Sequence, residues 1–286
     1  MREESSIPLL KEHRLSKLVE ALKCIDKYSY DREKQRRCII ELYPGKTEKS
    51  VFRGMVIPTL RYLGLIVGFG KAIRLSGNGK IFVEAEKKGK EEVIRVARVI
   101  FLEIDKKMFK FIEELKRCKN TTKKDLINLL SPKMEGISEK QKNERINRWL
   151  NVLEECKLVR FDRGLIKLDE ENCKRAEIEL NLLPPLSSFK EMLFEVYKSL
   201  PLNETAGMVD IPLLRLQVAI NYYKKYNIIL TESKFDNLLG RLPLVTDEYI
   251  VSLGQPMGAE EKLFHYKGNY YKTLSITFFK KVDKHE

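Results

Sequence analysis

Residues 138–168, SEKQKNERINRWLNVLEECKLVRFDRGLIKL, hold a predicted helix followed by a predicted hairpin, and this pair decides how the rest of the chain is interpreted. Ser138 is a good N-cap, and the residues behind it predict a helix with one buried face. The apolar residues at helical spacing are Ile146, Trp149, Leu150 and Leu153. Two short strands, 158–161 and 165–168, follow and are joined by a tight turn at residues 162–164.

The other face of this helix is polar and cationic. An α-helix fits the major groove of B-DNA, where Arg or Lys reads guanine and Gln or Asn reads adenine. The candidate base or phosphate contacts on the helix are Lys140, Gln141, Arg145 and Arg148, and those on the hairpin are Arg160, Arg163 and Lys167. The alternative is a solvated face on which these cations pair with Glu139 and Glu144.

Two further helices are expected upstream of Ser138. Residues 90–118 keep helical register without a breaker, which predicts one long bridging helix or two nearly collinear ones; two helices broken near Asp105 are the alternative. Thr121 and Thr122 can cap a short helix that ends near Leu130. The expected order is therefore helix, helix, helix, hairpin.

The N-terminal part of the chain predicts the same order. Helices are expected at 15–25 and 31–42, a third begins at Thr47 and kinks at Pro58, and strands 63–67 and 72–75 meet at a glycine tip. The candidate DNA contacts of this part are Lys49, Ser50, Arg53 and Arg61 on the third helix, with Lys71 and Arg74 on the hairpin.

Residues 59–80, TLRYLGLIVGFGKAIRLSGNGK, resemble the winged-helix superfamily. Leu75-Ser76-Gly77-Asn78-Gly79 matches the Leu-Thr-x-x-Gly run that follows the wing in many members. The resemblance implies a mainly α fold with small β-hairpins, arranged as tandem winged-helix domains, and a DNA-binding or protein-interaction role. The glycine runs 68–71 and 77–80 lack the Walker spacing, so we expect turns there and no phosphate cradle.

Leu183-Pro184-Pro185 predicts the clearest boundary, because consecutive prolines cannot continue a helix. We therefore expect three modules, residues 1–89, 90–183 and 184–286. The last should contain helices at 189–200, from Asp210, and at 232–239, then strands at 248–253 and 262–276. This winged-helix-like module is rich in tyrosine, which suits a homodimer or protein-partner surface.

The charge of the chain indicates a polyanionic partner, and we expect double-stranded DNA. The 286 residues carry a formal net charge of +13. Residues 1–104 have 22 basic and 14 acidic side chains (+8), residues 105–186 have 19 and 15 (+4), and residues 187–286 have 13 and 12 (+1). Because the excess falls along the chain, the first two modules are the expected contact. A charged surface typical of heat-adapted proteins is the alternative.

The five cysteines form no CxxC pair and only three histidines accompany them, so we expect reduced core cysteines, no metal and no cofactor. No apolar run is long enough to span a bilayer, which predicts a cytoplasmic protein without a membrane partner.

The sequence favours a non-enzymatic protein over an enzyme. Glu232-Ser233-Lys234 and Glu86-Lys87-Lys88 match half of a restriction-type metal site, and His265-Tyr266-Lys267 matches a phospholipase-D-like core, but the other residues that such sites need are missing. The sequence therefore predicts a DNA-binding regulator, replication initiator or recognition subunit of a restriction or defence system. A nuclease with a cryptic metal site and a winged-helix interaction scaffold are the alternatives.

Overall fold

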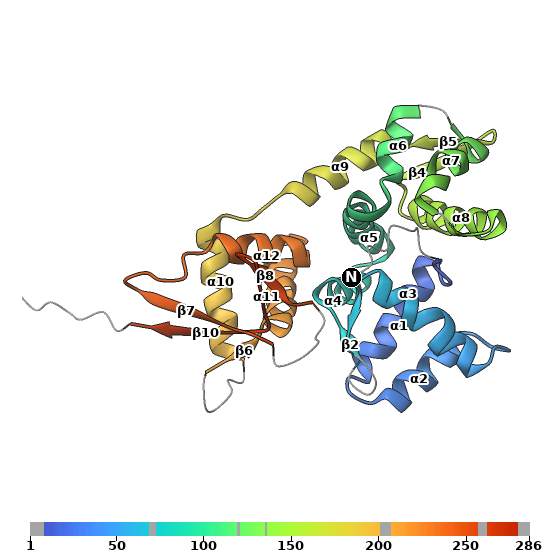
Figure 1. Cartoon of the computed structure of the whole chain (residues 1–286). Coiled ribbons are helices and arrows are strands. Elements are labelled where there is room, and N and C mark those ends of the chain that lie inside the picture. Colours follow the sequence, from blue (N-terminus) through green and yellow to red (C-terminus); the bar gives the residue numbers. More distant parts are fainter. Residues whose placement is uncertain are drawn as a thin grey trace, which may run out of the picture. The chain divides into compact units, whose positions relative to one another are not determined.

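The computed structural model describes residues 9–68, 73–118, 121–134, 136–200, 207–256 and 262–279. The protein is mainly helical with small antiparallel sheets, in agreement with the predicted α+β class (Figure 1). Its contacts divide it into two units: Met1–Leu75 with Gly79–Leu182, and Ser76–Asn78 with Leu183–Glu286. The division of the first unit near residue 89 stays a prediction.

The N-terminal part of the first unit has the predicted order of helix, helix, helix and hairpin. Helices α1 (Leu15–Lys27) and α2 (Arg32–Glu41) are followed by the π-helix η1 (Lys49–Val56), helix α3 (Ile57–Tyr62) and strands β1 (Ile66–Val67) and β2 (Arg74–Leu75). The two strands pair antiparallel. The expected glycine tip between them lies outside the described residues.

The predicted kink at Pro58 takes the form of a change of helix type. Pro58 has no N–H to donate to the carbonyl of Gly54. The chain widens to a π-helix before the proline, and the Ile57 N–H donates to the carbonyl of Phe52, five residues back. Helix α3 then begins with the proline in its first turn, where the missing donor costs no hydrogen bond.

The expectation that every cysteine is reduced is wrong for Cys24 and Cys38. The two side chains form a disulfide between α1 and α2, with Cα atoms 5.7 Å apart. The contact between α1 and α2, which amphipathic spacing alone does not specify, brings the two side chains together. Cys156 and Cys173 are free and buried as predicted, whereas Cys118 is free but exposed.

Gly77 and Gly79 are not turn glycines, as the sequence suggested, but lie in helix α4 (Gly77–Glu86). Gly79 allows this helix to approach the residue before β1, because a Cβ at position 79 would lie 2.0 Å from the carbonyl oxygen of Leu65. A close approach of two backbones therefore explains Gly79.

The expected long bridging helix is wrong, and the alternative break near Asp105 is right. Helix α5 (Lys90–Ile104) passes into the short π-helix η2 (Asp105–Phe109), and helix α6 (Phe111–Cys118) follows. Lys110 adopts φ +59°, which ends the helix. The buried carboxylate of Asp105 accepts the N–H groups of Phe111 and Ile112 at 3.1 and 3.0 Å and so caps α6.

The middle of the chain adds strand β3 (Thr121–Thr122), helix α7 (Lys123–Leu130), the 3-10 turn η3 (Ser131–Met134), helix α8 (Glu139–Glu155), strands β4 (Val159–Asp162) and β5 (Leu165–Leu168), and helix α9 (Glu170–Asn181). Thr122 and Asp125 form a capping box, and Ser138 caps α8 through its side chain as predicted. The three strands are ordered β3-β5-β4.

The second unit repeats this topology. It contains α10 (Leu186–Ser199), β6 (Val209–Asp210), α11 (Ile211–Tyr226), α12 (Glu232–Arg241), β7 (Tyr249–Gly254), the hairpin β8 (Phe264–Tyr266) and β9 (Asn269–Tyr271), and β10 (Thr273–Phe278). Its main sheet is ordered β6-β10-β7, so a short strand between the first two helices again pairs with the last strand. Hairpin β8–β9 is an insertion before that last strand.

Candidate nucleic-acid interface

Some of the candidate DNA contacts in the N-terminal part are exposed to solvent, and others bind elsewhere in the fold. Val51, Phe52, Met55 and Val56 are buried, so Lys49, Ser50 and Arg53 are exposed on the opposite side. Arg61 is engaged by the fold, because its guanidinium donates to the carbonyl of Gly68 at 2.8 Å and so holds the end of β1. Arg74 is half-exposed on β2, and Lys71 lies outside the described residues.

Helix α8 buries the predicted apolar face, Ile146, Trp149, Leu150 and Leu153. Of its candidate contacts, Lys140 and Gln141 in the first turns are exposed, while Arg145 is half-buried. The cationic face of α8 is therefore most open at its N-terminal end.

Arg148 is committed to intramolecular contacts. Its guanidinium donates to the backbone carbonyls of Leu10 and Lys11 at 3.0 and 2.7 Å and pairs with Glu144 at 2.6 Å. Further along α8, the Glu155 carboxylate accepts the N–H of Leu15 at 2.5 Å. This side of α8 therefore anchors the segment that leads into α1, a contact that no local sequence pattern indicates.

The hairpin β4–β5 presents two of its three candidate cations to solvent. Arg160 is exposed, and Arg163 occupies the turn with φ +48°. Lys167, opposite Arg160 in the antiparallel register, pairs with Asp162 at 2.5 Å, and this ion pair lowers the pKa of the Asp162 carboxyl. One of the three hairpin cations is thus partly neutralised within the hairpin.

A basic groove of about 590 Å³ lies beside this hairpin. Its charged lining is contributed by α6, the hairpin and α9: Lys116, Arg160, Lys167, Lys174, Glu170 and Glu177. Lys116 pairs with Glu177 at 2.7 Å. Lys116 and Lys174 were missed in the sequence because they stand on helices outside the helix-hairpin pair. Because Lys116 and Lys167 pair with Glu177 and Asp162, Arg160 and Lys174 are the cations of this groove that favour an anionic ligand.

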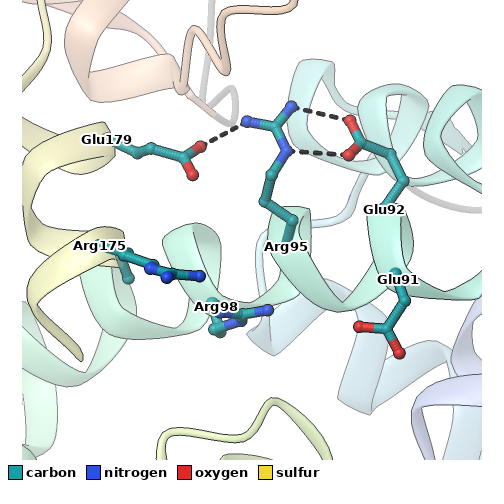
Figure 2. Close-up of a pocket in the computed structure, with 7 residues that line it drawn as sticks. Glu91, Glu92, Arg95, Arg98, Arg175 and Glu179 are labelled. Carbon is teal, nitrogen blue, oxygen red and sulfur yellow. Dashed lines mark hydrogen bonds and ion pairs between the residues drawn. The ribbon is translucent and has the colours of Figure 1, made fainter. Parts of the chain in front are cut away.

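A second charged pocket, between α5 and α9, is occupied by its own ion pairs. Figure 2 shows Arg95 reaching from α5 to two carboxylates. Its guanidinium binds Glu92 through two nitrogens, at 2.9 and 2.7 Å, and Glu179 of α9 at 2.5 Å. Arg98 donates to the side-chain oxygen of Asn172. These bonds hold α9 against α5, and we assign them a structural role.

The residues of the nuclease-like triplets take part in other contacts. Glu232 pairs with Lys262 at 2.7 Å, and the buried Lys234 donates to the carbonyl of Ile229. Glu86 pairs with Lys23, and the ring of His265 contacts that of Tyr270. Within the described ranges, no three His, Cys, Asp or Glu residues are grouped so that they could hold a metal ion.

The tyrosines of the second unit are mostly structural. Tyr222, Tyr223 and Tyr249 are buried in the core. Tyr226 and Tyr270 are 44% and 55% exposed, and Val245 is 70% exposed, so part of the apolar surface of this unit remains open.

No family model matches the chain, and neither the curated proteins nor the solved structures contain a match. No helix among the described residues has the length and apolar content needed to cross a bilayer.

Proposed function

We propose that the protein binds double-stranded DNA through tandem winged-helix modules, using the first two. The observation that carries the proposal is that basic and amide side chains occupy the same position in both modules. In both modules the helical segment before the β-hairpin, η1 with α3 in the first and α8 in the second, buries its apolar face. Its other face exposes basic or amide side chains, Lys49 and Arg53 on η1 and Lys140 and Gln141 on α8. Such groups bind phosphates and base edges in the major groove.

The topology supports the winged-helix assignment. The order helix, strand, helix, helix, two strands describes α6–β5, and it also describes α10–β10 when the inserted β8–β9 hairpin is set aside. The segment α1–β2 differs by lacking the first strand. In this assignment the β8–β9 hairpin enlarges the wing of the third module. The groove beside β4–β5 supplies further cations, Lys116 and Lys174, for the DNA backbone.

The salt dependence of DNA affinity tests the proposal. Fluorescence anisotropy with a labelled duplex should give an affinity that falls steeply with salt, because phosphate contacts release counterions. Replacing Arg53, Lys140 or Arg160 with glutamine should lower the slope of log K against log salt by about 0.9 for each phosphate that the variant no longer neutralises. Arg241→Gln, an exposed change on α12 in the nearly neutral module, is the matched control.

Binding that is absent at low salt, or insensitive to salt, would remove the proposal. Equal reductions of affinity in the Arg241→Gln control and the three test variants would also contradict it. They would show that affinity depends on the net charge of the protein and not on the position of the cations.

A protein-interaction role for the second unit is the second candidate. The exposed Val245, Tyr226 and Tyr270 favour it, because aromatic residues are enriched at interfaces. Light scattering after size-exclusion chromatography should then show a concentration-dependent dimer that Val245→Glu abolishes. A monomer at all concentrations would exclude the homodimer.

A further inference from the structure

A cavity of about 450 Å³ lies between the start of α2 and helix η1. Tyr30 and Arg32 line it from the side of α2, and Phe52 and Arg53 line it from the side of η1. Its volume falls within the range of roughly 300–1,000 Å³ that is typical of small-molecule sites.

Two of the guanidinium groups that line this cavity have no carboxylate partner among the described residues. Arg36 binds Glu48 at 2.7 Å and also Glu33, while Asp31 pairs with Lys34 at 3.0 Å. Asp31 is therefore neutralised by Lys34, whereas Arg36 is shared between Glu33 and Glu48. The lining as a whole, Arg32, Arg36 and Arg53 against Asp31 and Glu33, carries a net charge of +1. Arg32 and Arg53 have no carboxylate partner in the part of the chain that the structure describes. The cavity consequently carries a local positive charge and attracts an anion.

The contact of Arg32 with Phe52 orients one of these groups. The guanidinium carbon lies 6.0 Å from the centre of the Phe52 ring, a cation–π distance, and the ring itself is buried. Stacking of this kind leaves the N–H edge of a guanidinium free to bind a phosphate through two hydrogen bonds.

Tyr30 supplies an exposed aromatic wall. Its side chain is 66% exposed, and its backbone has φ +68°, a conformation that a bulky L-residue adopts at a cost of about 1–2 kcal/mol. The Asp31 N–H donates to the carbonyl of Tyr28 at 3.0 Å and holds this turn. An exposed ring on a strained backbone, beside two guanidiniums that lack a carboxylate partner, is a feature that core packing does not require.

We propose that this cavity binds one nucleotide, with the phosphate between Arg32 and Arg53 and the base stacked on Tyr30. The inference deepens the proposed DNA-binding function and rests on it only where the nucleotide belongs to a DNA strand, as an end or an unstacked position. A free mononucleotide offers the same chemistry, since every base has a stacking face and the phosphate supplies the charge.

Titration of the full chain with deoxyadenosine monophosphate, inorganic phosphate and a single-stranded oligonucleotide with or without a 5′-phosphate tests this assignment. Tyr30→Asn removes the ring but tolerates the left-handed backbone. This change should weaken nucleotide binding about 5- to 150-fold, the range of base–aromatic stacking, and leave phosphate binding unchanged. Arg32→Gln should weaken the binding of both. Thermal melting checks that the variants fold.

Two matched controls isolate the pocket. Tyr270→Asn removes an exposed tyrosine from the second unit, and Arg37→Gln removes an exposed charge from α2 outside the cavity. Both should bind as the unaltered protein does. If Tyr30→Asn and Arg32→Gln weaken the binding of the mononucleotide, the cavity is a site for free nucleotides. If they weaken only the binding of the oligonucleotide, it is a site for a nucleotide within a strand.

The inference is overturned if neither ligand responds to Tyr30→Asn and Arg32→Gln, or if the controls weaken binding as much. Failure of the proposed function has a different signature. Absence of duplex binding in the unaltered protein would remove the DNA-binding proposal, whereas nucleotide binding sensitive to Tyr30 would still stand.

Discussion

The indole N–H of Trp149 on α8 donates to the carboxylate of Asp105 at the end of α5, at 3.0 Å across 44 residues of sequence. The same carboxylate accepts the Phe111 and Ile112 N–H groups, so one buried side chain breaks α5 from α6 and fixes α8 against both. Three donors compensate the cost of burying the charge.

Asp105→Ala should therefore lower the free energy of unfolding by about 3–5 kcal/mol, because it leaves three buried donors unsatisfied. Trp149→Phe removes only one donor and should cost less. Urea denaturation followed by circular dichroism measures both changes. A decrease below about 1 kcal/mol for Asp105→Ala would show that the carboxylate does not organise this junction.

Gly79→Ala should destabilise the first unit by about 1–3 kcal/mol or more, the usual cost of overpacking. The new Cβ would lie 2.0 Å from the Leu65 carbonyl oxygen, so α4 must move away from β1. Gly240→Ala in α12 is the matched control, because its Cβ would first meet an atom at 3.8 Å. That variant should gain about 0.5–1 kcal/mol from helix propensity. Equal effects of the two changes would contradict the close approach.

The Cys24–Cys38 bond should be visible by thiol counting. With five cysteines and one disulfide, the denatured protein should react at three thiols before reduction and at five afterwards. Replacing both with serine should cost about 3 kcal/mol, since the bond closes a loop of about 15 residues. Cys118→Ser, an exposed free cysteine, should have no such effect. Five reactive thiols before reduction would refute the pairing.

Glu12 should make stability depend on acid pH. Burial by itself raises the pKa of this carboxyl, but hydrogen bonds from the Arg14 side chain and backbone outweigh it and lower the pKa from 4.5 to about 2. A depressed folded-state pKa stabilises the fold above the unfolded value, and that stability is lost as the pH falls from 4.5 towards 2. The free energy of unfolding should decrease between pH 7 and pH 3, and in Glu12→Gln this decrease should be smaller by about 2 kcal/mol. An identical pH profile for both proteins would contradict the assignment.

Arg148→Gln should loosen the N-terminal segment rather than abolish DNA binding. The guanidinium holds the carbonyls of Leu10 and Lys11, so its removal should speed tryptic cleavage after Lys11 and Arg14 by several-fold. Glu144→Gln, which removes only the ion pair, should change cleavage little. Cleavage unaffected by Arg148→Gln, together with a large decrease in duplex affinity, would instead place Arg148 on the DNA surface.

The sequence by itself determined the elements whose signals are local. The apolar spacing of α1 and α8 predicted buried faces that the structure confirms. Ser138 and Thr122 act as caps and Pro58 as a breaker, because capping and proline sterics involve only neighbouring residues. The same periodicity predicted that the candidates Lys49, Arg53 and Lys140 are exposed, because residues opposite the buried face of a helix point towards solvent.

Tertiary structure alone decided the features that join distant residues. The break at Asp105 depends on α6 and Trp149, the disulfide on the alignment of two helices, Gly79 on the approach of Leu65, and Arg148 on a segment 138 residues away. The cavity at Tyr30 likewise needs α2 and η1 to meet. Periodicity reports which face of an element is buried but not which residues it is buried against, because partners are chosen by packing across the whole fold.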